Sequence, residues 1–220
     1  MGRREDAKTE RRERIIRAAR ELIRETGDAG LSMRVLARRA GVSLTTPYNL
    51  FGSKRAIVMG ALQDAQPFAE AFAKLKPVDP LERMFKAAAI AIDLYAADPA
   101  FYRTLFVALF DIRGGEEYRT LFGPGRHAFW RGLLAEAVEA GQLVGDFELD
   151  LFTSQIEQIF LSTLLQWVTN EIAAAQLAPT VGYGFALVLG TVATDPHRPG
   201  LTARRKAFEQ CLSGLRTVRA

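Results

Sequence analysis

The side chains with the clearest chemical potential lie between residues 44 and 54, and their types suit binding rather than catalysis. Threonine hydroxyls can hydrogen-bond base edges or phosphates, asparagine can make a bidentate contact with adenine, and tyrosine can reach a phosphate. The candidates for contact with a DNA groove are Leu44, Thr45, Thr46, Tyr48 and Asn49, with Arg34 nearby in the sequence. The alternative for Tyr48 is a half-buried packing role.

These side chains need a rigid scaffold, and residues 31–55 predict one. Ser32 is a good N-cap for a first short helix, whose apolar residues share one face. Gly41 suits the left-handed conformation in which a helix ends. Ser43 is placed to cap a second helix that runs through Phe51. The order of helix, glycine turn and helix is that of a helix-turn-helix, whose second helix usually enters the major groove.

Pro47 complicates the start of this second helix. If Ser43 is the N-cap, Pro47 is the fourth helical residue, and its missing N–H removes one intrahelical hydrogen bond. Proline also restricts Thr46, which precedes it. The alternative is that the helix restarts with Thr46 as N-cap and Pro47 at its first position.

Charge is distributed unevenly along the chain. Residues 1–60 contain fourteen Lys/Arg and seven Asp/Glu, whereas the remaining 160 contain fifteen basic and eighteen acidic residues. A basic N-terminal region followed by a slightly acidic remainder indicates that the N-terminal region binds a polyanion. Residues 1–8 are expected to form a polar arm that is disordered or ordered only by DNA.

The run from Ser32 to Lys54 resembles the N-terminal signature of the TetR family of bacterial transcription regulators. The residues that carry the resemblance are Ser32, Leu36-Ala37, Ala40-Gly41-Val42-Ser43, Tyr48, Phe51 and Ser53-Lys54, and Arg12 to Gly27 resembles the family's first helix. The resemblance implies an all-α fold. It places a three-helix helix-turn-helix DNA-binding domain over residues 1–54 and a larger helical ligand-binding and dimerisation domain over residues 55–220.

The resemblance also implies roles for individual residues. Tyr48 and Lys54 are the expected phosphate contacts, with Thr45, Thr46 and Asn49 nearer the bases. Pro47 and Leu50 depart from the family's pattern, and this affects the expected operator sequence rather than DNA binding itself.

Apolar periodicity and helix-start signals predict helices throughout the body and no strand. They are expected over residues 9–26, 53–65, 80–97, 99–112, 126–140, 150–175, 180–194 and 202–215, with a short helix between 115 and 123. Residues 76–78 are expected to be a connector, and residues 195–200 a proline-rich loop.

Aromatic residues of the body are the candidates for a pocket that takes an apolar or aromatic small molecule. They are Phe85, Tyr95, Tyr102, Phe106, Phe110, Trp130, Phe160 and Trp167, together with His127. The alternative for the aromatic residues is ordinary core packing. For His127 it is a hydrogen-bonded position in the core or at the pocket rim.

A second apolar face on the helix predicted over residues 150–175 indicates a subunit interface. The candidates are Leu161, Leu165 and Val168, with the small residues Gly182, Ala186 and Gly190 on the next helix. Paired from two chains, these helices would form a four-helix bundle, which is also the family's usual arrangement.

Other classes of protein are disfavoured by what the sequence lacks. Neither His127 nor His197 is spaced to pair with a second metal ligand, and no nucleotide-binding or nucleophile motif is present. We expect no enzyme activity, no cofactor and no metal. The single Cys211, the charged N-terminus and the short apolar stretches indicate a cytoplasmic protein that is not in a membrane.

Two functional hypotheses follow. The first is a homodimeric transcription repressor that binds a palindromic double-stranded DNA operator and is released by a small hydrophobic effector. The alternative is an all-helical small-molecule-binding or scaffolding protein that does not bind DNA.

Overall fold

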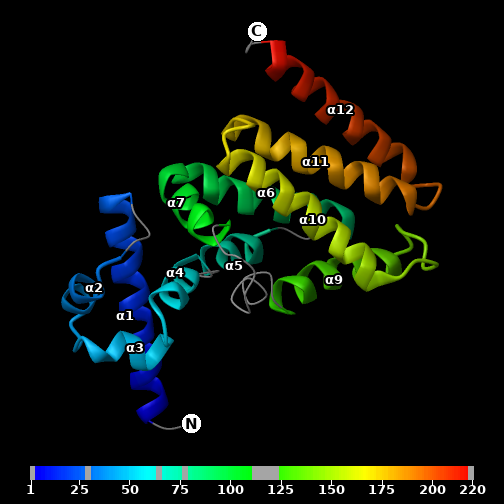
Figure 1. Ribbon diagram of the computed structural model, residues 1–220. Coiled ribbons are helices and arrows are strands. Elements are labelled where there is room, and N and C mark those ends of the chain that lie inside the picture. The colour runs from blue at the N-terminus through cyan, green and yellow to red at the C-terminus, as the bar shows by residue number, and fades with distance from the viewer. Residues whose placement is uncertain (1–2, 28–30, 63–65, 76–78, 111–123, 218–220) are drawn as a thin grey trace. The chain divides into compact units, whose positions relative to one another are not determined.

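The computed structural model describes residues 3–27, 31–62, 66–75, 79–110 and 124–217, and within these ranges the chain is almost wholly α-helical (Figure 1). The helices are α1 (Arg3–Thr26), α2 (Met33–Arg39), α3 (Thr45–Phe51), α4 (Lys54–Leu62), α5 (Gln66–Ala73), α6 (Pro80–Ala97), α7 (Pro99–Phe110), α9 (Pro124–Glu139), α10 (Leu149–Val168), α11 (Ala174–Thr191) and α12 (Arg198–Thr217). This confirms the predicted all-α fold. Over the described ranges, no helix is both long and apolar enough to cross a membrane. The predicted connector 76–78 and the short helix between 115 and 123 lie outside the described residues.

The helices belong to two compact units. Unit 1 comprises residues 1–66 and 98–121, and therefore contains α1 to α4 together with α7. Unit 2 comprises residues 67–97 and 122–220, and contains most of α5 and all of α6 and α9 to α12. The predicted boundary after residue 54 separates a DNA-binding domain from a ligand-binding domain. It does not coincide with the division into these two compact units, and it stays a prediction.

The core of unit 1 lies along one face of α1. Ile15, Ala19 and Ile23 are fully buried on this face, as are Leu36 of α2 and Ile57 of α4. The helix begins at Arg3, so the expectation of a disordered arm over residues 1–8 is wrong for residues 3–8. The local sequence explains the early start, because acidic residues occupy the first turn and no glycine or proline follows until the helix ends.

Arginines on α1 fasten it to α4 and α7 within unit 1. The Arg20 guanidinium donates to the Ala61 carbonyl at 2.6 Å and lies 4.9 Å from the ring centroid of Phe101. Arg24 lies 4.4 Å from the same centroid, and its Nε is 2.6 Å from the Asp98 carboxylate. The helix α7 begins at Pro99, which confirms the start predicted at Asp98-Pro99. The Asp98 side chain also binds α1 through Arg24.

In unit 2, a buried amide links the start of α6 to the turn after α9. Asp79 caps α6 by accepting the Glu82 N–H at 3.0 Å, as its position before Pro80 predicts. The Gln142 side chain is 6% exposed; it donates to Asp79 and accepts the Leu81 N–H, each at 3.0 Å. Burial raises the pKa of Asp79, but these hydrogen bonds and the nearby Arg204 outweigh burial and lower it overall.

The two long helices predicted near the C-terminus differ in their bounds. The helix expected over residues 150–175 ends at Val168, because Asn170 adopts a left-handed φ of 63°. Asparagine is the residue that most often replaces glycine at this position, so the sequence carried the signal. The next helix begins at Ala174 rather than near Thr180.

The last helix begins at Arg198 and not near Thr202, so the expected loop over residues 195–200 is shorter than predicted. Pro199 is its second helical residue, where a missing N–H costs no intrahelical hydrogen bond.

Gly182 permits the close approach of α11 and α12. A Cβ built on Gly182 would lie 2.4 Å from Cζ of Phe208, whereas a Cβ on Gly190 would meet nothing within 4 Å. The two glycines therefore have different roles, although the sequence places them eight residues apart on one stripe.

Alanine at these two glycines should have opposite effects on stability. Gly190→Ala should stabilise the protein by about 0.5–1 kcal/mol, because alanine loses less backbone entropy in a helix. Gly182→Ala should destabilise it by about 1–3 kcal/mol, because the Phe208 ring must move. Urea unfolding followed by tryptophan fluorescence checks this, since Trp130 and Trp167 both lie in unit 2. Equal shifts for the two variants would contradict the assignment.

Candidate nucleic-acid interface

The turn between α2 and α3 is built as the sequence predicts. Ser32 caps α2 by accepting the Val35 N–H at 3.5 Å. Gly41 adopts a φ of 65°, and the Val42 N–H bonds back to the Ala37 carbonyl at 3.0 Å. Because that conformation strains any residue with a side chain, the glycine sets the direction in which the chain enters α3.

Neither prediction for the start of α3 is correct. The helix begins at Thr45 with Leu44 as its N-cap, and no side chain bonds a free amide there. The Ser43 hydroxyl instead lies 3.0 and 2.8 Å from the hydroxyls of Thr45 and Thr46. A restart at Thr46 is excluded because Thr45 is already helical.

Pro47 is the third residue of α3, where no intrahelical N–H bond is lost. The N–H of a residue other than proline at position 47 would point toward the Ser43 carbonyl. That carbonyl instead accepts the Thr46 N–H at 3.0 Å. Pro47 is also the buried residue of the helix, so it packs α3 against the rest of unit 1. The proline is therefore accommodated without disrupting the helix.

Thr45, Tyr48 and Asn49 form the exposed face of α3, at helical spacing of three and four residues. Tyr48 is 47% exposed and Leu44, just before the helix, is 46% exposed. Thr46 is half-buried, and its hydroxyl is engaged with Ser43. Four of the five predicted groove contacts are therefore accessible together on one short helix and its N-cap.

The remaining predicted DNA contacts flank this face. Arg34 is exposed on α2, and Lys54 is half-buried at the start of α4, which Ser53 caps by accepting the Ala56 N–H at 3.0 Å. By contrast, Arg39 is engaged in a two-pronged pair with Glu25, with N–O distances of 2.7 and 2.9 Å. The hydrogen bond from Arg39 lowers the pKa of Glu25, so the positive charge of Arg39 is paired with a carboxylate within unit 1.

The residues predicted for a ligand pocket fall into both units. Tyr102 and Phe106 are buried in unit 1, and the side chain of Phe110 lies outside what the structure describes. Phe85, Trp130, Phe160 and Trp167 are buried in unit 2, where Tyr95 is half-buried.

In unit 2 the aromatic rings form a connected cluster. Trp130 lies 6.4 Å from Phe160 and 5.5 Å from Phe185 between ring centroids, and Tyr95 is 6.4 Å from Phe160. Phe85 contacts Phe185 at 6.3 Å. Rings at these distances and tilts pack favourably, so the cluster is part of the core of unit 2.

Sequence reasoning missed three rings beside this cluster. Phe68 and Phe72 of α5 stack with centroids 5.8 Å apart, and Phe129 of α9 meets them edge-on at 5.4 and 5.2 Å. All three are half-buried. The spacing of four residues between Phe68 and Phe72 was the available signal, because it places both on one helix face.

His127 forms part of a charged cluster on α9 and α10. Its Nδ1 lies 2.9 Å from the Glu157 carboxylate and its Nε2 lies 3.4 Å from Asp150. Arg126 and Arg131 bind the same two carboxylates at 3.3 and 2.7 Å. The hydrogen bond with Glu157 raises the pKa of His127 most, and burial opposes it. His127 is thus a hydrogen-bonded residue, 29% exposed at its side chain.

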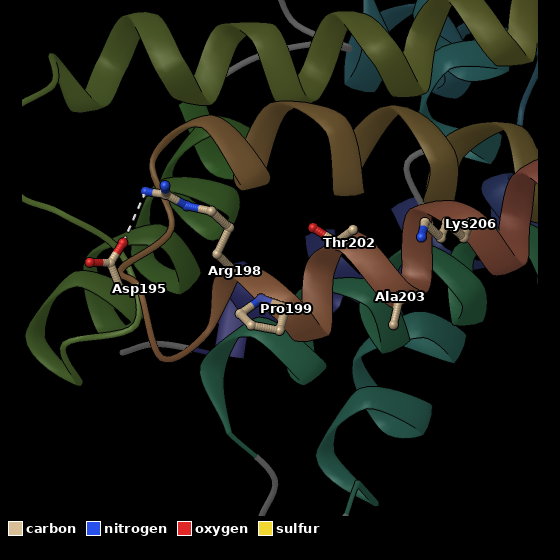
Figure 2. Close-up of a pocket in the computed structure, with 6 residues that line it drawn as sticks. All are labelled: Asp195, Arg198, Pro199, Thr202, Ala203 and Lys206. Atoms are coloured by element: carbon tan, nitrogen blue, oxygen red, sulfur yellow. Dashed lines mark ion pairs between the residues drawn. The ribbon is translucent and has the colours of Figure 1, made fainter.

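A shallow pocket lies along the first turns of α12. Its lining residues are Asp195, Arg198, Pro199, Thr202, Ala203 and Lys206, and Figure 2 shows the Arg198–Asp195 pair at its edge, 3.6 Å apart. The lining contains no aromatic residue, so it is not the pocket that the sequence predicts. Among the residues that the structure describes, no group of histidine, cysteine and carboxylate side chains could hold a metal ion.

The predicted interface residues divide into exposed and buried sets. Leu165 is 40% exposed and Leu161 and Gly190 are half-buried, whereas Val168 and Ala186 are buried at 8% and 2%. Gly182 is buried against Phe208 of the same chain. Leu187 on α11, which sequence reasoning did not select, is 42% exposed.

Known proteins share both the helix-turn-helix and the fold. Residues 15–59 match the model of the family described as bacterial regulatory proteins, tetR family. The fold resembles TylP, a TetR regulator from Streptomyces fradiae, with a TM-score of 0.62, 18% identity and coverage of 92% of this chain and 97% of that one. No curated protein sequence matches the chain.

Two further solved structures show the same fold. SmeT, the repressor of the Stenotrophomonas maltophilia multidrug efflux pump SmeDEF, matches with a TM-score of 0.61 and 18% identity over 84% of this chain and 91% of that one. QsdR, a repressor from R. erythropolis, matches with a TM-score of 0.57 and 21% identity over 84% and 96%. Residues 15–59 thus match the tetR-family model, and the chain shares its fold with solved regulators of that family.

Proposed function

We propose that this chain is a cytoplasmic transcription repressor that binds a palindromic operator as a homodimer and is released by a small apolar or aromatic ligand. The observation that carries the DNA-binding part is the exposed face of α3, where Thr45, Tyr48 and Asn49 stand together after the glycine turn. Pro47 does not favour the alternative without DNA binding, because the helix accommodates it without loss of a hydrogen bond.

Tyr48 and Lys54 are proposed to contact phosphates, and Thr45 and Asn49 to contact base edges, with Leu44 touching a thymine methyl group. Arg34 is proposed as a further phosphate contact. Thr46 is better suited to positioning, because its hydroxyl is held by Ser43. These assignments follow from exposure and side-chain chemistry.

A dimer is proposed because one short helix reads too few bases to select an operator, and regulators of this kind bind two half-sites about 34–36 Å apart. We propose that Leu161, Leu165, Leu187 and Gly190 contribute to the interface, since they retain exposed surface on α10 and α11. Val168, Gly182 and Ala186 are proposed to support these helices from within the protomer.

The effector is proposed to bind among the aromatic residues of unit 2. Trp130, Phe160, Tyr95 and the half-buried Phe129 offer ring faces and few polar groups, which suits an apolar or aromatic molecule. Repression and release are then linked. The dimer is proposed to adopt two forms, and only one of them spaces its two helix-turn-helix domains to fit both half-sites. A ligand that binds more tightly to the other form lowers operator affinity, by as much as its affinities for the two forms differ.

The proposal is tested by selecting DNA from a random library and measuring binding by fluorescence anisotropy over a range of salt. Lys54→Ala should weaken binding to all sequences and reduce the salt slope by about 0.9 for each phosphate that the protein no longer neutralises. Asn49→Ala should instead cost about 1–3 kcal/mol at one base position. Lys206→Ala on α12 is the control, with the same change of charge in unit 2. Failure of the wild-type protein to enrich any sequence would refute the proposal.

A further inference from the structure

The N-terminal turns of α1 extend beyond the folded core of unit 1. The helix begins at Arg3, whereas its first buried apolar residue is Ile15 and the tetR-family match also begins at residue 15. At 1.5 Å per residue the extension is about 18 Å long. Figure 1 shows α1 continuing past α3 toward the N-terminus. Packing alone does not account for a helix over these exposed turns.

Charged side chains of both signs surround this extension. Lys8 and Arg11 precede Ile15 by seven and four residues, so they continue the side of α1 that packs on the helix-turn-helix. Asp6, Glu10 and Glu13 are spaced by four and three residues and lie on the opposite side. All five side chains are exposed. Lys8 and Arg11 therefore offer two positive charges to an anion on their side of the helix, beside which Glu5 also lies.

Arg12 fixes this extension beside the recognition helix. Its guanidinium carbon lies 4.3 Å from the ring centroid of Phe51, and its Nη1 donates to the Leu50 carbonyl in the last turn of α3. That carbonyl is among those that a helix leaves without an internal partner at its C-terminus. Lys8 is one helical turn from Arg12. Arg11 is adjacent to Arg12 in the sequence, and its Nε donates to the Ala7 carbonyl of α1 at 3.0 Å.

We propose that Lys8 and Arg11 form a second DNA-contacting element, which binds phosphates flanking the groove occupied by α3, and that Arg12 is a positioning residue for α3. This inference rests on the proposed DNA-binding function. The contacts are to the backbone, because lysine and arginine on the side of a helix outside the groove meet phosphates rather than base edges. They add affinity and salt dependence without adding sequence preference.

The phosphate contacts are tested with the double variant Lys8→Gln/Arg11→Gln against the control Arg14→Gln/Arg17→Gln. The control removes the same charge from exposed positions of α1 outside the Lys8–Arg11 side. The first variant should bind operator and random DNA more weakly, by roughly fivefold for each of the two side chains at about 0.15 M salt, with a salt slope lower by about 0.9 for each. The control should keep the wild-type slope.

A wild-type slope in the Lys8/Arg11 variant, or an equal loss in the control, would overturn the inference while the proposed function stands. A wild-type protein that binds no DNA would instead overturn the proposed function.

The role of Arg12 is tested by Arg12→Lys, which keeps the charge but removes the planar group that stacks on Phe51. Operator affinity should fall roughly three- to tenfold, because the planar stacking is removed and the shorter, flexible lysine no longer holds the donor at the Leu50 carbonyl, while the salt slope stays as in the wild type. Circular dichroism should show an unchanged helix content. Full operator affinity in this variant, or a reduced salt slope, would overturn the positioning role.

Discussion

Glutamate at both Leu165 and Leu187 should convert the proposed dimer to a monomer that remains folded. These leucines are 40% and 42% exposed, one on α10 and one on α11, so a charge there costs little in an isolated protomer. In a dimer it would bury unpaired carboxylates on both sides of a two-fold axis. Sedimentation at micromolar concentration measures the change in mass.

Operator affinity should fall with the loss of the dimer, by roughly 10²–10⁴-fold, because the second half-site is no longer bound at high effective concentration. Leu151→Glu is the matched control, since Leu151 is 69% exposed at the start of α10 and is not assigned to the interface. Its mass and affinity should equal those of the wild type. A double variant that sediments as a dimer would place the interface elsewhere, and a monomeric wild type would refute the dimer and the palindromic operator together.

Trp167→Ala should produce the largest loss of stability in unit 2. Trp167 is 0% exposed and is the largest of the fully buried side chains, so its removal leaves a cavity that its neighbours can fill only in part. The expected cost is about 3–5 kcal/mol. Urea unfolding followed by circular dichroism measures it, and the fluorescence of the remaining Trp130 reports on the same unit.

Two reference variants are compared with Trp167→Ala in the same experiment. Trp167→Phe should cost less, because most of the ring volume is kept. Leu151→Ala should change the stability by no more than about 0.5 kcal/mol, because the side chain is exposed. If Trp167→Ala cost less than about 1 kcal/mol, the ring would not be anchoring the core.

Local features of the fold could be predicted from the sequence because neighbouring residues determine them. Ser32 and Asp79 cap α2 and α6 as expected, since an N-cap depends on a side chain and an amide three residues away. Gly41 ends α2 with a positive φ, which few other residues tolerate. The helix-turn-helix, its resemblance to a family and the residues it exposes could therefore be predicted, because the entire motif lies within one short stretch of sequence.

Two helix bounds differ from the prediction although local residues explain them. Asn170 ends α10 in the left-handed conformation, whereas the two apolar stripes predict a helix that continues to residue 175. Pro47 was expected to cost a hydrogen bond or restart the helix. The start of α3 at Thr45 places it where no bond is lost.

The tertiary structure decided which neighbours the side chains meet. Gly182 and Gly190 share one stripe in the sequence, yet Phe208, twenty-six residues beyond Gly182, occupies the space at Gly182 alone. Arg12 belongs to a charged run in the sequence, and only the fold brings it to Phe51 and the end of α3. Helix caps and turns depend on contacts a few residues apart, whereas these pairings depend on how helices distant in the chain pack. The sequence therefore determined the helix-turn-helix and its match to the tetR-family model, and the packing of helices determined which residues support that motif.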